Sequence, residues 1–86
     1  MKKAEIENDK FDDFTKKYLK QLGQRIKELR LKKGYSSYEQ FAYEHEISRS
    51  QIGRYENGQD LRISSLFKLL QIFEISAEEF FSEGFT

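Results

Sequence analysis

The chain has no cysteine and no proline, and only five of its 86 residues are glycine. Without cysteine it can form neither disulfides nor thiolate metal sites, and a reducing cytoplasm is compatible with this composition. The lack of proline and the few glycines favour a mostly helical domain with short connections. No apolar run approaches the roughly 20 residues of a membrane span, and no hydrophobic segment follows MKKAEIENDK as in a secretory signal. We therefore expect a cytoplasmic protein that has no membrane partner.

A net charge of zero hides an uneven distribution of charge along the chain. Between residues 16 and 34 the single acid is Glu28, and the basic residues there are Lys16, Lys17, Lys20, Arg25, Lys27, Arg30, Lys32 and Lys33. Acidic residues gather towards both ends of the chain instead. Because local fields govern association with anions more than net charge does, this basic run is compatible with nucleic-acid binding. A solvated helix face between acidic ends is the alternative interpretation.

A chain of this length is expected to form one domain with one core. Apolar residues at steps of three and four predict a first helix from about Asp9 to Gly34, and they are Phe11, Phe14, Tyr18, Leu22, Ile26 and Leu29. Gly23 is a weak helix former, which leaves open whether the helix continues through this position or breaks there. We expect residues 1–8 to form a flexible leader and residues 9–86 to form the domain.

Four shorter helices are predicted after Gly34, and no segment shows the alternation of polar and apolar residues that is typical of a strand. Their expected spans are 38–45 after a cap at Ser36 or Ser37, 48–56 with a cap at Ser48, 64–73, and a short helix after Ser76 that carries Phe80 and Phe81. The prediction is therefore an all-α domain.

The second and third predicted helices, joined by a tight turn, are the most informative part of the chain. The third helix is expected to bury Ile52 and Tyr55 and to present Arg49, Ser50, Gly53 and Arg54 on its other face. A helix with one buried side and small or forked donors on the other suits the major groove of DNA. Arginine can donate two hydrogen bonds to guanine there.

Three segments carry a resemblance to a known family: LGQRIKELRLKKG at 22–34, YEQFAYEHEISRSQIGRYENG at 38–58 and SSLFKLLQIFEISAEEFF at 64–81. In this order they resemble the DNA-binding domain of the lambda-repressor/Cro-like (XRE) family. The resemblance implies a compact five-helix fold with a helix-turn-helix at 38–56, to which this chain adds an N-terminal helical extension. Glu46 stands where the turn of the family usually holds glycine. We expect Glu46 to adopt a positive φ, at a cost of roughly 1–2 kcal/mol.

The resemblance also implies how the chain contacts DNA. Helix 48–56 would enter the major groove and contact bases through Arg49, Ser50, Gly53 and Arg54. Contacts with the DNA backbone are expected from helix starts and from the loop after the recognition helix, through Ser37, Tyr38, Ser48, Gln51, Asn57 and Arg62. Arg30 and Glu56 match positions that form a structural ion pair in relatives, and this pair would aim the recognition helix. The alternatives are phosphate contacts for the two arginines and a merely tolerated glycine at 53.

Neither catalysis nor cofactor binding is predicted from the sequence. His45 is the single histidine, and it has no partners at the spacing of a metal site. No pairing of a nucleophile with a base and no glycine-rich phosphate loop is recognisable. We therefore expect a protein that is not an enzyme and that needs no metal, no cofactor and no small-molecule ligand.

The leading hypothesis is a transcriptional regulator, acting as a repressor, that binds double-stranded DNA. A homodimer is expected because one recognition helix contacts only a few base pairs. Two surfaces compete for this role, Phe11, Phe14 and Tyr18 or Phe80, Phe81 and Phe85, unless the N-terminal residues simply extend the core. One alternative is a protein-interaction module on the same fold, an antitoxin or adaptor with little DNA affinity. Another is a basic amphipathic helix at acidic membranes.

Overall fold

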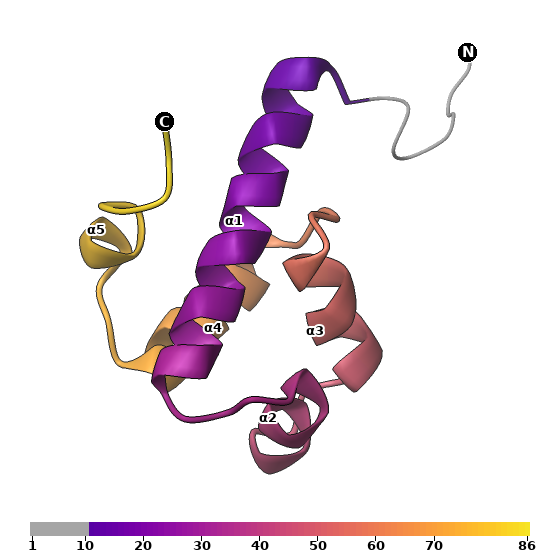
Figure 1. Ribbon diagram of the computed structural model, residues 1–86, viewed down its shortest axis with the longest axis vertical. Helices are drawn as coiled ribbons and strands as arrows, with labels where there is room; N and C mark the ends of the chain where they lie inside the picture. The colour runs from indigo at the N-terminus through magenta and orange to yellow at the C-terminus, as the bar shows by residue number, and fades with distance from the viewer. Residues whose placement is uncertain (1–10) are drawn as a thin grey trace.

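The computed structural model of the protein describes residues 11–86 and contains five α-helices there. They are α1 (Asp13–Lys32), α2 (Tyr38–Glu44), α3 (Arg49–Glu56), α4 (Ile63–Phe73) and α5 (Ala77–Phe80), as Figure 1 shows. No strand occurs in that range. The all-α, five-helix fold predicted from the sequence is confirmed. The flexible leader predicted for residues 1–8 lies outside the described residues.

The first helix begins at Asp13, so the predicted start near Asp9 is wrong. Asp12 has an extended backbone, and its carboxylate accepts a hydrogen bond of 2.9 Å from the N–H of Thr15. This bond satisfies one of the unpaired amides at the helix start and lowers the pKa of Asp12. The apolar pattern hid the boundary because Phe11, which precedes the cap, keeps the spacing of the helical residues.

Serine side chains cap three of the shorter helices. The hydroxyls of Ser37, Ser48 and Ser76 each accept a hydrogen bond from the backbone N–H three residues on, at 3.3, 3.3 and 3.0 Å. Ser37 rather than Ser36 is therefore the cap of α2. Each such cap typically stabilises a helix by about 1 kcal/mol. The fourth helix has no side-chain cap and starts at Ile63, one residue before the predicted Ser64.

Within two residues after the end of each of four helices, one residue has a left-handed backbone and turns the chain sharply. These residues are Gly34, Glu46, Gly58 and Glu74, with φ angles of 107°, 57°, 89° and 60°. Between α2 and α3, Ile47 N–H donates to Ala42 C=O at 2.9 Å and Glu46 N–H donates to Tyr43 C=O at 3.3 Å, which is a Schellman motif. The positive φ predicted for Glu46 is confirmed.

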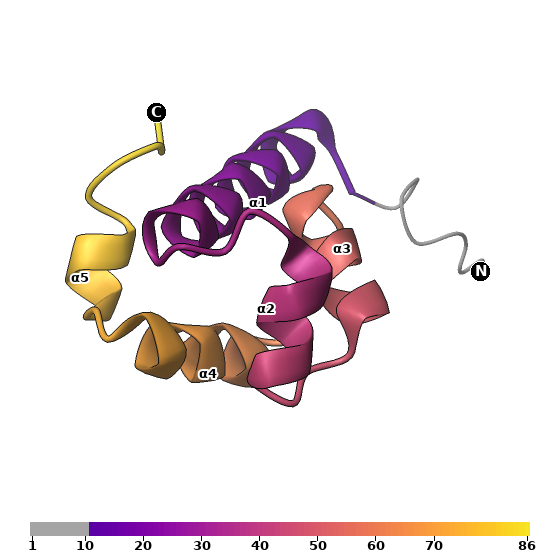
Figure 2. The same cartoon turned by 60° about the horizontal axis from the view of Figure 1, so that its bottom comes forward.

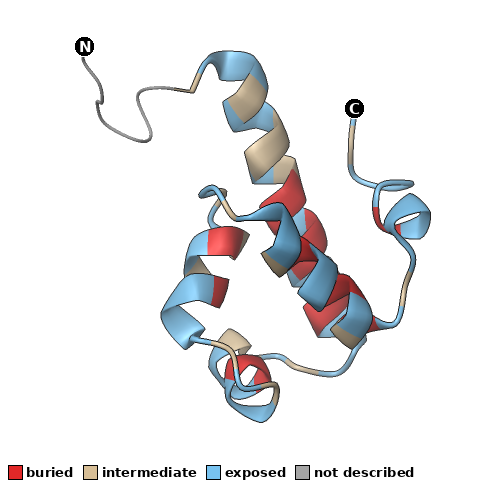
Figure 3. Cartoon of the chain, turned by 180° about the vertical axis from the view of Figure 1, so that it is seen from behind, coloured by how far each residue is buried: buried red, intermediate tan, exposed pale blue. Residues whose placement is uncertain are grey.

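One hydrophobic core receives a large, fully buried side chain from every helix, and these are Ile26, Phe41, Ile52, Leu69 and Phe80. Figure 2 shows α1 and α4 on opposite sides of this core, with α2 and α3 at one end and α5 at the other. The buried part of α1 starts at Leu22, and its first turns project beyond the other helices (Figure 3). Phe80 is 0% exposed, so its assignment to a dimer surface is wrong. The fifth helix turns this ring into the core and leaves Phe81 outside.

The first helix crosses α3 at Gly23 with no room for a side chain. A Cβ atom at this position would lie 2.4 Å from the carbonyl oxygen of Tyr55 and 2.8 Å from that of Glu56. Of the two alternatives left open at Gly23, the structure shows the continuous helix. The glycine permits close packing of α1 against the last turn of α3, which fixes where α3 lies.

We predict that Gly23→Ala lowers the free energy of unfolding by about 2–3 kcal/mol, because the added methyl group forces α1 and α3 apart. This loss outweighs the roughly 1 kcal/mol by which alanine is the better helix former. Equilibrium urea unfolding measures the change. Gln24→Ala, at the exposed neighbouring position of the same helix, is the matched control and should have little effect. Equal stability of Gly23→Ala and the parent protein would contradict the close contact.

Candidate nucleic-acid interface

The third helix buries one side and exposes the other. Ile52 is fully buried and Tyr55 nearly so, and both belong to the core. At about 100° per residue, Arg49 and Arg54 lie about 140° apart around the helix, with Ser50 and Gly53 between them. Both arginines are exposed, and neither forms an ion pair within residues 11–86. The two guanidinium groups therefore stand at opposite edges of the exposed face.

The first turn of α3 is ordered by two hydroxyl groups. The Oγ of Ser48 accepts from the N–H of Gln51 at 3.3 Å and lies 2.9 Å from the Oγ of Ser50. Both serines and Gln51 are exposed. The positive end of the helix dipole and its remaining free amides lie at this turn, where they favour an anionic group such as a phosphate.

Tyr38, the first residue of α2, lies over Gly53 of α3. A Cβ atom on Gly53 would be 3.2 Å from Cε1 of this ring and 3.3 Å from its Cζ and Oη atoms. Gly53 is half-buried as a result. The phenol of Tyr38 thus occupies the space that a side chain at position 53 would fill, so α2 contributes to the exposed surface beside the recognition helix.

A hollow of ≈220 Å³ separates α1 from this surface, and its lining comes from α1, α2 and α3. Tyr38, Gly53 and Asn57 line one side, and Gln24 and Lys27 of α1 line the other. In the sequence Lys27 stands out only as one member of the basic run, and Gln24 does not stand out at all. Gln24 and Lys27 lie one and four residues after Gly23 in the sequence. Recognising Gly23 as the point where α1 meets α3 would have identified them as neighbours of α3.

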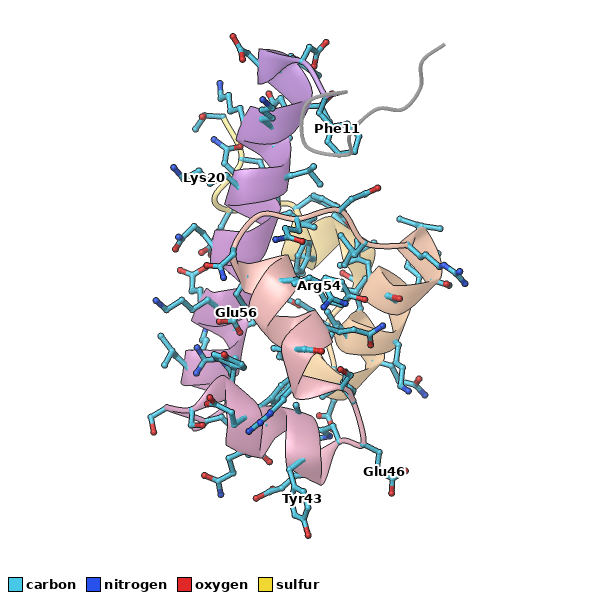
Figure 4. The ribbon with its side chains drawn as sticks, turned by 90° about the vertical axis from the view of Figure 1, so that its right-hand side faces the viewer. Phe11, Lys20, Tyr43, Glu46, Arg54 and Glu56 are labelled. Atoms are coloured by element: carbon cyan, nitrogen blue, oxygen red, sulfur yellow. The ribbon has the colours of Figure 1, made fainter. Side chains whose placement is uncertain are left out.

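Arg30 and Glu56 form a bidentate ion pair beneath that hollow. Arg30 Nε donates to Glu56 Oε2 at 2.8 Å, Nη2 donates to Oε1 at 3.0 Å, and Nη1 donates to the carbonyl oxygen of Tyr35 at 2.7 Å. The side chains are only 4% and 8% exposed. The hydrogen bond to Glu56 raises the pKa of Arg30. The guanidinium therefore joins α1, the end of α3 and the loop before α2. In Figure 4 Glu56 lies on the α1 side of α3 and Arg54 on the opposite side.

Arg25 is a second buried arginine, which the sequence did not single out. Its Nε donates to the carbonyl oxygen of Phe80 at 2.7 Å, Nη2 donates to that of Glu79 at 3.0 Å, and Nη1 pairs with Glu28 at 2.8 Å. This side chain holds α5 against α1. Two members of the basic run thus serve the fold, and the lysines remain for the surface.

The other residues expected to contact the DNA backbone are divided between two sides of α3. Ser48 and Gln51 line a hollow of ≈170 Å³ between the turn and α4, together with Lys68. Tyr38 and Asn57 line the hollow next to α1, and Ser37 caps the helix that Tyr38 begins. Arg62 lines neither hollow. It is the exposed residue before α4, at the end of the loop that follows α3.

A family model described as helix-turn-helix matches residues 26–80, which span the buried half of α1 and the four following helices. The chain belongs to the lambda-repressor/Cro-like (XRE) helix-turn-helix family. The helix-turn-helix domain supports DNA binding as its function. No curated protein and no solved structure matches the chain. Across residues 11–86, none of the helices is long and apolar enough to cross a membrane.

We predict that Glu56→Ala lowers both the stability of the helix-turn-helix domain and its DNA affinity. Removing the carboxylate leaves Arg30 buried without its partner, which costs about 3 kcal/mol. It also frees the end of α3 from α1. Thermal melting and a DNA titration on the same sample measure the two effects, and Glu78→Ala at an exposed position is the control. Unchanged melting together with unchanged DNA binding would remove the aiming role of the pair.

Proposed function

We propose that the protein is a transcriptional regulator that binds specific double-stranded DNA sequences and acts as a repressor. The observation that carries the proposal is the exposed face of α3, which offers Arg49, Ser50 and Arg54 while the opposite face is fixed to the core. A rigidly held helix of this kind fits the major groove of DNA, which is about 12 Å wide. A domain that occupies a promoter excludes other proteins from it, and this exclusion is the proposed means of repression.

Base recognition falls in this proposal to Arg49, Ser50, Gly53 and Arg54. An arginine at each edge of the exposed face can make a bidentate contact with a guanine, worth roughly 1–3 kcal/mol of discrimination. The hydroxyl of Ser50 can bond to a base between them. Gly53 has no side chain, so its backbone could approach a base or a thymine methyl group.

Contacts with the DNA backbone position the recognition helix without reading sequence. We assign them to Ser37, Tyr38, Ser48, Gln51, Asn57 and Arg62, and we add Lys27 because it lines the hollow beside α3. The starts of α2 and α3 offer free amides to phosphates, and Lys27 and Arg62 offer positive charge. Tyr38, Asn57 and Lys27 line the hollow on one side of α3, and Ser48 and Gln51 line the hollow on its other side. Contacts on both sides would suit a helix that lies between the two walls of a groove.

The regulator is proposed to act as a homodimer. A single recognition helix contacts only a few base pairs, and two copies on half-sites about one DNA turn apart multiply the specificity. The two-fold symmetry of such a dimer would appear in the operator as a palindrome.

We predict salt-dependent binding to random duplex DNA. Lysine and arginine contacts with about five phosphates would release counterions, so affinity should fall roughly 10²- to 10³-fold between 50 and 200 mM salt. Fluorescence polarisation at the two salt concentrations measures this fall. Absent or salt-independent binding would refute DNA recognition and would favour an interaction module that binds proteins.

A pair of arginine variants should separate base recognition from backbone contact. Arg54→Ala should relax the preference for one base pair of a selected site by about tenfold, because it removes a groove contact. Arg62→Ala should weaken binding to all sequences alike and reduce the salt slope by about one unit. Competition titrations with single-base variants of the site measure both. Arg54→Ala that weakens all duplexes equally would reduce Arg54 to a phosphate contact.

A further inference from the structure

A broad, open apolar groove lies where the two ends of the described chain meet, on the side of α1 that continues its buried stripe. Its volume is ≈450 Å³, and its walls are Phe14, Thr15, Tyr18, Leu19 and Leu22 of α1 with Phe81 and Phe85. Phe14 and Tyr18 from one of the expected dimer surfaces therefore share this groove with Phe81 and Phe85 from the other. A water molecule occupies about 30 Å³ in the liquid. The groove is many times larger than this, so it has room for an aromatic ring.

The walls of the groove are held in place by contacts within the chain. Tyr18 Oη donates to the carbonyl oxygen of Thr86 at 2.7 Å, and Gln21 Nε2 donates to its Oγ1 at 3.1 Å. The ring of Phe85 lies 5.0 Å from that of Phe81. The groove is thus formed before any partner arrives, which lowers the entropic cost of binding.

The apolar surface of the groove continues onto exposed rings. Phe14 is 70% exposed and Phe81 is 46% exposed, and both line the groove. Phe14 also stacks edge-on against Tyr18, with 4.9 Å between the ring centroids. Two exposed aromatic rings beside an apolar groove form a larger apolar patch than the scattered single residues of an ordinary surface, and such patches mark interaction sites.

We propose that a second copy of the chain covers this groove, with the two α1 helices antiparallel about a two-fold axis near Phe14. Two charged residues beside the groove favour a second copy of the chain as the partner and an antiparallel direction of its α1. Asp12 and Lys16 lie one helical turn apart on the same edge of the apolar stripe. An antiparallel pair places Asp12 of each copy beside Lys16 of the other, and Phe14 lies midway between them. In a parallel pair about a two-fold axis, this edge of each copy would face the other edge of its partner, so Asp12 and Lys16 would not pair.

This arrangement leaves the recognition surface open. No residue that lines the groove belongs to α2 or α3, and the groove lies along the part of α1 that precedes Gly23. The inference identifies the interface of the homodimer in the proposed function. Its test measures association in the absence of DNA, so its outcome is independent of whether the protein binds a duplex.

Sedimentation equilibrium of the full chain is the experiment. We expect a dimer with a dissociation constant in roughly the micromolar range. Phe14→Glu should raise this constant roughly tenfold or more, because it places a charge at the centre of the apolar contact. Phe81→Glu should do the same at the opposite wall. Phe67→Glu, at an aromatic residue of α4 that is 55% exposed and lies outside the groove, is the matched control and should leave the constant unchanged.

A charge cycle tests the antiparallel direction. Lys16→Glu should weaken the dimer, and adding Asp12→Asn should restore part of the loss, because asparagine keeps the helix cap but removes the opposing charge. Circular dichroism verifies that each variant is folded, and Phe14→Glu decides the matter if Phe81→Glu unfolds. A monomer at about 0.5 mM chain, where a micromolar dimer would be nearly complete, overturns the proposal. So does a dimer that Phe14→Glu leaves unchanged or that Phe67→Glu weakens equally. If Asp12→Asn restores none of the association lost in Lys16→Glu, the antiparallel direction is wrong.

Discussion

The contact between α1 and the last turn of α3 fixes the geometry on which the proposed DNA-binding surface depends. It has two parts, the side-chain-free approach at Gly23 and the ion pair between Arg30 and Glu56 about two turns further along α1. The first sets how near the helices lie, and the second sets how α3 is rotated, because a bidentate pair fixes both distance and direction. The orientation of α3 therefore rests on the backbone of one helix and on a single charge pair.

The basic residues of α1 divide into two classes with different physical roles. Arg25 and Arg30 are buried and donate to carbonyl oxygens and carboxylates, so their charges are largely neutralised within the fold. Guanidinium suits this use because its planar fork satisfies several acceptors at once. The lysines of the same run stay exposed, where their charges act on solvent and ligands. The grouping of exposed lysines on one helix gives a chain of zero net charge a locally basic surface.

Much of the fold was predictable because its signals are local. Ser48 and Ser76 cap helices as expected, and the position of Glu46 in the helix-turn-helix pattern was enough to predict its left-handed backbone. The sequence indicated only that Gly23 is a weak helix former. Its role in close packing depends on the carbonyl groups of α3, which are far away in the sequence. Phe80 and Phe81 are neighbours of equal hydrophobicity, and only the orientation of α5 decides which of them is buried.

The candidate site was predictable in part for the same reason. The exposed positions of α3 follow from the helical period once Ile52 and Tyr55 are recognised as core residues. The neighbours contributed by α1 do not follow from any local pattern, because the crossing of two helices brings Gln24 and Lys27 to the surface beside α3. The burial of Arg25 could not be predicted, because a buried arginine and a solvated arginine look the same in a run of basic residues.

The packing of Tyr38 against Gly53 links the identities of two residues on different helices. A side chain introduced at position 53 would meet the phenol ring at 3.2–3.3 Å, so the ring would have to shift by a few tenths of an ångström. If α3 contacts bases as proposed, a substitution at position 53 therefore also moves a side chain of α2, and the two positions are best varied together.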